Sequence, residues 1–359
     1  MLSSLIRILL IIVSFSSLSS FSNAVFAQND IANRCGTVEL LQQRIKRDPT
    51  LKARIQQQDR QLRQSVLQRS NFKTDIAPVI IPVVFHIVMT NPSLVTDAQI
   101  MAQMDTLNND YSGSNGDSVK IPSYFKPLFG KTAIRFVLAQ RTPGNEVTNG
   151  IDRVTTSVTS FNVNNVNTVK HSLTGGTEAW NTSGYLNVWV CSLSGGLLGI
   201  ATFPDDGVPE EQGVVIHYSS VPGSAGTNFN RGKTLTHEVG HYFNLYHIWG
   251  DDDGACTGTD QVDDTPNQGN FTSGCKTGVI TDNCSMASPG VMYQNYMDYT
   301  YDECMVMFTA QQAVRMEASM TNFRSSLYNS IGGVPLVRFD RDADLRMLTS
   351  PQQRLCTSG

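Results

Sequence analysis

The chain has 359 residues, 40% of them hydrophobic, and a formal net charge of −4 that is unevenly distributed. Residues 28–75 contain ten Lys or Arg against five Asp or Glu, whereas residues 76–359 contain sixteen against twenty-six. An acidic body in which no basic patch alternates with aromatic residues argues against nucleic acid as a partner. The basic leader, residues 28–75, suggests a segment that docks on this body; the alternative is a solvated helical linker, because Leu40 to Leu67 is rich in Gln, Arg and Leu.

Residues 1–27 have the pattern of a secretory signal peptide. Arg7 is their only charged residue, an apolar run extends from Ile6 to Val13, and Val25-Phe26-Ala27 is a small-residue cleavage site. The run is too short to span a bilayer and no later segment is long and apolar enough, which predicts a secreted protein without a membrane span. Seven cysteines in an exported chain indicate disulfides and an odd thiol.

The rest of the chain is expected to form one sizeable domain with two lobes, residues 76–330, followed by a tail, residues 331–359. In the upper lobe, residues 76–244, we predict strands over 79–88, 134–138, 185–190, 199–204 and 213–218, and a helix over 96–111 capped by Thr96. Pro82 predicts an edge position or a bulge for the first strand. The lower lobe, residues 245–330, is poor in apolar residues over 251–295, so crosslinks or ions must hold it. Its last helix is predicted over about 309–323.

The stretch from His237 to His247, HEVGHYFNLYH, has the pattern of a zinc site with its own general base. His237 and His241 stand four residues apart, so both imidazoles can bind one ion from a single helix face. Glu238 lies one step round the helix, where its carboxylate can act as general base on a water bound to the metal. His247 can join only if the helix stops and the chain folds back, which Asn244 permits because Asn tolerates the left-handed conformation. Three imidazoles leave one position open, as in catalytic zinc sites.

Together with Ile248-Trp249-Gly250-Asp251 and Asn295-Tyr296-Met297-Asp298-Tyr299, this motif resembles the pappalysin family of metzincin zinc metallopeptidases, in particular its ulilysin-like members. The resemblance covers about residues 78–323; Asn244 stands where most metzincins have Gly. It implies an α/β (α+β) fold with a twisted mixed sheet, a backing helix, a zinc-binding active-site helix over the cleft and an irregular disulfide-bonded lower lobe. It also implies a secreted zinc endopeptidase, made as a latent zymogen, that cleaves peptide and protein substrates.

Two other functions stay open on the sequence alone. An exported binding or adhesion module could hold a structural zinc, but it would need neither an open coordination position nor Glu238. Amidase or esterase action on non-peptide substrates is not excluded, although a cleft lined by a strand favours peptides. The strand from Gly199 to Phe203 is our candidate for that rim, pairing a substrate by strand addition.

The resemblance also implies roles for residues outside the zinc motif. Met297 would form a hydrophobic turn beneath the zinc, and the Tyr299 hydroxyl would lie near the metal and hydrogen-bond a developing oxyanion. Arg34-Cys35-Gly36 is similar to a cysteine-switch segment, so Cys35 would bind zinc in the latent form and make residues 28–75 a pro-segment; a stray or disulfide-bonded thiol is the alternative. The family pairing of the lower-lobe cysteines would be Cys256 with Cys284 and Cys275 with Cys304, whereas the sequence allows three pairings and leaves the state of Cys191 and Cys356 open.

Two acidic groups suggest further sites. Asp260, Asp263 and Thr265 offer hard oxygen donors in a loop where the family carries calcium, although a solvated acidic loop is the alternative. Asp302 matches an acid at the base of the family's primed-side pocket, which would favour cleavage on the amino side of Arg and, less well, of Lys. It could instead face solvent with its acidic neighbours. The leader offers suitable sites for self-activation at Arg60, Arg63 and Arg69.

Overall fold

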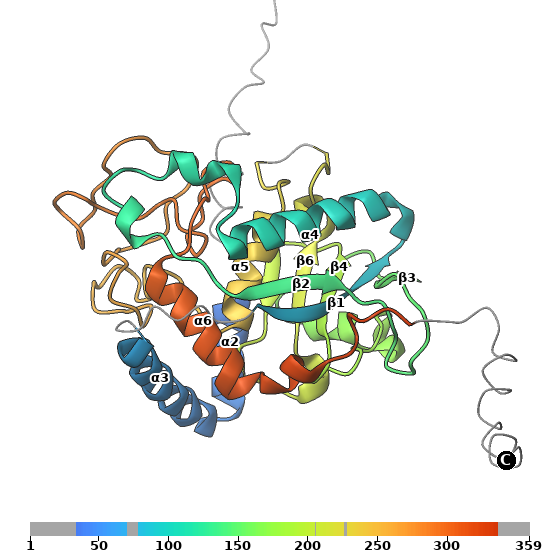
Figure 1. The fold of residues 1–359 in the computed structure, drawn as a ribbon. Helices are drawn as coiled ribbons and strands as arrows, with labels where there is room; N and C mark the ends of the chain where they lie inside the picture. Colours follow the sequence, from blue (N-terminus) through green and yellow to red (C-terminus); the bar gives the residue numbers. More distant parts are fainter. Residues whose placement is uncertain (1–33, 70–77, 205, 226–227, 337–359) are drawn as a thin grey trace, which may run out of the picture.

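A computed structural model describes residues 34–69, 78–204, 206–225 and 228–336, so the predicted signal peptide and Cys356 lie outside the described residues. Within these ranges the chain forms one twisted sheet with helices packed on it and an irregular lobe at one end (Figure 1). No helix in this part of the chain has the length and apolar composition that crossing a bilayer requires.

The sheet has six strands: β1 (Val79–Met89), β2 (Ile134–Leu138), β3 (Ile151–Thr155), β4 (Leu186–Cys191), β5 (Gly199–Ala201) and β6 (Val214–His217). Their order is β2-β1-β4-β6-β5, and β3 pairs with the second half of β1. Only β5 runs antiparallel to its neighbour, which makes the sheet mixed, as predicted. The strand predicted as the cleft rim is therefore an edge strand of the sheet.

The prediction that Pro82 marks an edge strand is wrong for β1 as a whole, although the position of Pro82 itself is open on one side. β1 is a central strand that pairs with β2 and β3 on one side and with β4 on the other. Its pairing with β4 starts only at Val83. Pro82 therefore has no β4 residue opposite it, and its lack of a backbone N–H removes no hydrogen bond between the two strands. Strand β3 was not predicted, because Ile151–Thr155 is short, carries two charged residues and stays partly exposed.

The two faces of the sheet bury different cores. On one face, Val83, Phe85 and Ile87 of β1 join a large apolar cluster with α4 (Asp97–Ser112) and α5 (Lys233–Tyr242). On the other face, side chains of β1, β4 and β6 pack beneath the irregular segment 156–185. Thr96 caps α4 in a reciprocal capping box with Gln99, which explains why the predicted start of this backing helix is correct.

The lower lobe contains neither helix nor strand between residues 245 and 308, and disulfides join its loops. The bonds are Cys256–Cys284 and Cys275–Cys304, the pairing that the resemblance implies. Helix α6 (Ala310–Phe323) then returns along the domain, starting at a capping box made by Thr309. Cys191 is a free, buried cysteine in β4.

The leader forms two helices, α2 (Thr37–Arg47) and α3 (Thr50–Arg69), in place of one continuous helix. The break follows Asp48, the residue before a proline, where the helical conformation is disfavoured. Helix α2 buries Leu40 and Leu41 against the domain, and α3 lies beside α6 (Figure 1). Of the two alternatives for the leader, docking on the body is the one that the structure has.

Candidate active site

Helix α5 carries the first two histidines and is buried along its whole length. Gly240 faces Met297 on the lower lobe: a Cβ at this glycine would lie 2.6 Å from the Met297 sulfur. Met297 is itself fully buried, so it packs directly against the helix that carries His237 and His241. This close contact explains why position 240 needs a residue without a side chain.

The helix ends in a sharp turn at Asn244, whose φ is 72°. The backbone N–H of Leu245 donates to the Gly240 carbonyl over 2.9 Å, as in a helix that closes through a left-handed residue. The guanidinium of Arg315, on α6, donates to the Asn244 carbonyl (2.8 Å) and to its side-chain oxygen (3.0 Å). Arg315 therefore fixes both the backbone and the side chain of the residue that turns the chain back toward His247.

The three histidine side chains converge. The Nε2 atom of His241 lies 3.2 Å from the Nε2 atoms of both His237 and His247. Each Nδ1 faces an acceptor-only oxygen: the Tyr296 carbonyl, the Leu245 carbonyl and the Asp251 carboxylate, at 2.7, 2.7 and 2.8 Å. The proton must therefore be on Nδ1, which leaves three Nε2 lone pairs directed at one point. This donor set, buried and oriented from behind, fits a zinc ion.

Glu238 lies beside the histidines under the rim strand. A Cβ at Gly199 of β5 would lie 2.5 Å from Glu238 Oε1, so the strand can pass over this carboxylate only because residue 199 is glycine. Burial raises the pKa of Glu238 to about 7, near the working range of a group that must both accept and return a proton.

The leader enters the cleft along β5. Gly199 N–H donates to the Arg34 carbonyl (3.1 Å), and Gly36 N–H donates to the Gly199 carbonyl (3.0 Å). The Thr37 hydroxyl donates to Glu238 Oε2 over 2.9 Å. These bonds bring the Cys35 sulfur to the histidines: Sγ and the imidazole ligand atoms all lie within 4.8 Å of one another. Strand addition at the rim, expected for a substrate, is here made by the leader.

The lower lobe contributes an aromatic wall around His247. Tyr299 is buried, and its hydroxyl lies 3.4 Å from His247 Nε2. Trp249 stacks on the His247 ring with the centroids 4.2 Å apart. The sequence did not identify Trp249, Asp251 or Arg315 as site residues. The sequence did contain a signal for Asp251, because this acidic residue stands four residues after His247. In the structure its carboxylate contacts His247 Nδ1.

Asp302 is fully buried and faces the buried guanidinium of Arg34, and the position that this guanidinium takes beside Asp302 is termed the Asp302 pocket. Its Oδ2 accepts backbone N–H groups of Arg231 (2.8 Å) and Lys233 (3.3 Å), whereas Oδ1 has no hydrogen bond among the described residues. The Arg34 guanidinium approaches Oδ1 to 3.9 Å and donates to the Thr300 carbonyl over 2.8 Å. The alternative of a solvent-facing Asp302 is excluded by its burial.

The structure separates the three residues of the acidic loop into two settings. Asp260 is buried and accepts a hydrogen bond from the Thr265 hydroxyl at 2.8 Å, and burial raises its pKa to about 7. Asp263 is exposed and forms an ion pair with Arg63 of the leader at 3.1 Å. Asp260 and Thr265 therefore lie together, whereas Asp263 is paired with Arg63 of the leader.

Comparisons with known proteins agree with this geometry. Residues 172–321 match the family model Peptidase_M43, described as pregnancy-associated plasma protein-A. An extracellular metalloprotease of Arthroderma gypseum is 32% identical over 257 residues, 69% of this chain and 74% of the relative; one of Trichophyton verrucosum is 34% identical over 265 residues, 71% and 77%. Among solved structures, Tannerella forsythia mature mirolysin in complex with a cleaved peptide has 46% identity and a TM-score of 0.69, covering 71% of this chain and 97% of that one. A promirolysin mutant from the same organism has 42% identity and a TM-score of 0.75, covering 82% and 97%.

The converging histidines and these relatives define a class: the protein is a zinc metallopeptidase, a hydrolase of peptide bonds. Within that class the chain belongs to the M43 family, the pappalysins, which confirms the resemblance seen in the sequence. Like its curated relatives, it is an extracellular enzyme, and its fold is that of the mirolysin-like metzincins.

Proposed function

We propose that this extracellular peptidase is made as a latent zymogen and cleaves on the amino side of Arg and, less efficiently, of Lys. The observation that carries the proposal is the position of Arg34: its guanidinium fills the Asp302 pocket while the next residue, Cys35, faces the histidines. The leader thus presents to the site the side chain that we expect in a substrate. The promirolysin relative, a pro-form matched over more of this chain than mature mirolysin, supports the zymogen part.

The pocket chemistry favours a guanidinium over an ammonium. Asp302 Oδ1 has no hydrogen bond in the described structure, and a buried carboxylate oxygen without a hydrogen-bond partner is costly. The planar Arg34 group contacts this oxygen and also lies over the Phe229 ring, with 4.7 Å between the guanidinium carbon and the centroid. A lysine can satisfy the charge but cannot make the stacked, multiply donating contact. This difference gives the expected order of Arg over Lys.

The site residues divide the chemistry among them. A zinc ion held by His237, His241 and His247 would supply the Lewis acid that polarises the scissile carbonyl and promotes ionisation of water. Glu238 takes the proton of the attacking water and delivers it to the leaving amine. The Tyr299 hydroxyl, which lies 3.4 Å from His247 Nε2, donates a hydrogen bond to the oxygen on which negative charge develops.

Latency follows from the same contacts. The Cys35 thiol lies where the fourth ligand of the zinc would be. The Thr37 hydroxyl donates a hydrogen bond to the carboxylate of Glu238, the general base. A leader that covers both the metal position and the base leaves no room for a substrate. We therefore assign residues 28–75 as pro-segment and residues 76–330 as the catalytic domain, with self-activation in the stretch that contains Arg60, Arg63 and Arg69.

Peptide-library cleavage tests the specificity. We expect the activated enzyme to require Arg or Lys after the scissile bond, and Asp302→Asn to lower kcat/KM for Arg peptides about a hundredfold. Glu303→Gln, an exposed neighbour, is the matched control. A preference for apolar residues at that position, or an Asp302→Asn enzyme with unchanged preference, contradicts the assignment. For latency, Cys35→Ala should release activity from the uncleaved precursor; a silent Cys35→Ala precursor would mean that latency is steric.

Calcium is the second cofactor that we propose. Asp260 and Thr265 offer buried and half-buried oxygens, and Asp263 becomes available when Arg63 leaves with the pro-segment. We expect calcium to raise the melting temperature of the activated, zinc-loaded enzyme, since a ligand at a hundredfold excess over its Kd stabilises by about 2.7 kcal/mol. Asp260→Ala should abolish this increase. The absence of a shift on adding calcium to chelated, zinc-replete wild type refutes the proposal.

A further inference from the structure

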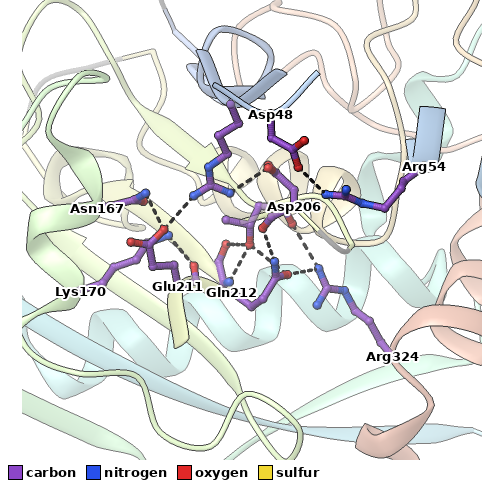
Figure 2. A network of polar contacts seen from close by, with 11 residues as sticks. Asp48, Arg54, Asn167, Lys170, Asp206, Glu211, Gln212 and Arg324 are labelled. Carbon is purple, nitrogen blue, oxygen red and sulfur yellow. Dashed lines mark hydrogen bonds and ion pairs between the residues drawn. The ribbon is translucent and has the colours of Figure 1, made fainter. Parts of the chain in front are cut away.

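A second cluster of charged residues lies under the end of α2, and Figure 2 shows its members from the catalytic domain. Arg44 of the leader inserts between Asp206 and Glu211: Nη1 lies 2.9 Å from Asp206 Oδ1 and Nη2 lies 3.0 Å from Glu211 Oε2. The exposed fraction is 1% for Asp206 and 9% for Arg44. A guanidinium of the leader is thus held by two carboxylates in a largely buried position.

Residues of the catalytic domain surround the Arg44 guanidinium, and the space that it takes between them is termed the Asp206 pocket. Gln212 donates to the Asp206 carbonyl over 2.5 Å, and Arg324 at the end of α6 donates to the Gln212 side-chain oxygen over 2.9 Å, as Figure 2 shows. Gly207 forms the floor: its φ is +77°, and a Cβ there would lie 2.3 Å from Arg44 Nη1. The loop that contains Asp206 and Gly207 is therefore stabilised by residues of the catalytic domain, which remain after removal of the leader. The absence of a side chain at Gly207 leaves space for a planar guanidinium.

Within the described structure, no domain side chain hydrogen-bonds the Asp206 carboxylate. Its buried oxygens have Arg44 as their close ion pair. The nearby ammonium of Lys170 donates to the Glu211 carbonyl over 2.6 Å, and burial together with the charge of Arg44 lowers its pKa to about 7. Asn167 and His171 contact Glu211, not Asp206. Lys170 and Arg324 also interact with Asp206 by charge, but neither forms an ion pair with it within the described structure. After loss of the leader, Asp206 would therefore lose its one close ion pair, which is an unfavourable change for a carboxylate that is partly withdrawn from water.

The path of the leader places this pocket along the cleft. Arg34 fills the Asp302 pocket and Cys35 faces the histidines. Further on, Leu40 packs in one cluster with Ile200 and Leu41 in another with Phe203, which leads along the rim toward Asp206. The histidines therefore lie between the two arginine pockets. From Cys35 to Arg44 the path is about 17 Å, counting two extended and seven helical steps, which an extended peptide spans in about five residues.

We propose that Asp206 and Glu211 form a second guanidinium subsite, filled by Arg44 in the zymogen and open in the activated enzyme to an arginine of the substrate about five residues before the scissile bond. The inference rests on the proposed zymogen arrangement. It extends the substrate class from a single Arg to peptides with two spaced basic residues. The second Arg acts as an anchor and does not take part in the chemistry.

The test uses enzyme prepared from the full chain and activated by limited proteolysis of the leader. Peptides keep Arg after the scissile bond and carry one Arg, or Gln as the neutral counterpart, at each position from three to seven residues before it. We expect one of these positions, near the fifth, to raise kcat/KM about tenfold over its Gln peptide, mainly through KM. In the Asp206→Asn, Glu211→Gln double variant the ratio should fall to about one while the Gln peptides are cleaved as by wild type.

The controls separate this subsite from general charge effects and from folding defects. Glu210→Gln changes the exposed neighbour of Glu211 and should keep the tenfold ratio. A synthetic peptide of residues 34–47 should inhibit activated wild-type enzyme about tenfold better than the same peptide with Arg44→Gln, a comparison that needs no enzyme variant. Equal ratios at all five positions, a ratio that persists in the double variant, or equal inhibition by the two peptides would overturn the proposal.

These outcomes are distinct from failure of the proposed function. Loss of the requirement for Arg after the scissile bond concerns the Asp302 pocket, and it is read from peptides that vary only that residue. The upstream ratio is read from peptides in which that Arg is constant. Either result can therefore fail while the other holds.

Discussion

The two lobes position their share of the site in different ways. In the upper lobe, β5 and α5 place Gly199, Glu238 and the first histidines through ladder and helix hydrogen bonds over a continuous apolar core. In the lower lobe, loops without helix or strand place Met297, Tyr299 and Asp302. There, carboxylates accept backbone N–H groups in place of secondary structure. Asp298 Oδ1, for example, accepts from Thr272 (2.6 Å) and Tyr299 (2.7 Å).

The difference shows that a rigid site does not require regular structure on both sides of the cleft. The lower lobe contains three buried carboxyl groups and one half-buried carboxyl group whose pKa values are raised by loss of solvent: Asp260, Asp298, Asp302 and, half-buried, Asp264. Each accepts one or two backbone N–H groups that an ordinary helix or strand would pair with carbonyls, at the cost of desolvating a charge. The upper lobe should therefore respond to changes in apolar packing, and the lower lobe to changes in pH and crosslinking.

The largest effect that we expect separates the chemical roles of the lobes. Glu238→Gln, in the upper lobe, should lower kcat of the activated enzyme by about 10³-fold or more, because it removes the general base while keeping shape and burial. Tyr299→Phe, in the lower lobe, removes one hydrogen-bond donor and should cost about tenfold to a hundredfold. Steady-state kinetics with parallel zinc analysis decides this, since both variants should retain one zinc. Equal losses would mean that the two lobes share the chemistry evenly.

Crosslinking gives the next effect. Cys275→Ser with Cys304→Ser opens a loop of 29 residues and should lower the free energy of unfolding by about 3 kcal/mol. Because Cys304 stands two residues after Asp302, KM for Arg peptides should also rise. Cys191→Ala, at the free buried thiol of β4, is the upper-lobe control and should cost only about 1 kcal/mol without changing KM. Denaturant unfolding of both variants in the Glu238→Gln background, which prevents autolysis, measures the difference; similar losses would contradict it.

The contrast between the lobes also explains what the sequence could predict. The upper-lobe strands, α4 and the HEVGHYFNLYH turn follow from periodicity, capping and the φ that Asn244 tolerates, and the structure has them within a few residues. Short β3 and the central place of β1 could not be predicted, because pairing partners are set by tertiary contacts. Likewise, Arg315 is 71 residues from Asn244, and no local pattern signals their contact.

Acidity provides a smaller effect that again distinguishes the lobes. Burial raises the pKa of Asp298 from its ordinary value of 3.8 to about 6. The folded state then holds a proton more tightly than the unfolded chain, so the free energy of unfolding falls as pH rises from about 4 to 6. Asp298→Asn lacks this titration, and the stability of wild type relative to the variant should fall by about 2 kcal/mol between pH 4 and 7. Urea unfolding at the two pH values measures it; a constant difference shows that Asp298 stays charged throughout.

The smallest effect concerns Asn244, the residue at which the upper lobe ends and the lower lobe begins. Its φ of 72° favours Asn or Gly, and its side-chain oxygen accepts a hydrogen bond from Arg315. Asn244→Gly removes the hydrogen bond and keeps the conformation accessible, whereas Asn244→Ala removes the bond and adds backbone strain. Ala should therefore lower the free energy of unfolding by about 1 kcal/mol more than Gly, and it should weaken zinc binding more, since His247 depends on this turn. Urea unfolding and zinc titration of the two variants make the comparison. If Ala and Gly behave alike, the contacts of Arg315 with the chain, and not the left-handed turn, determine where His247 lies.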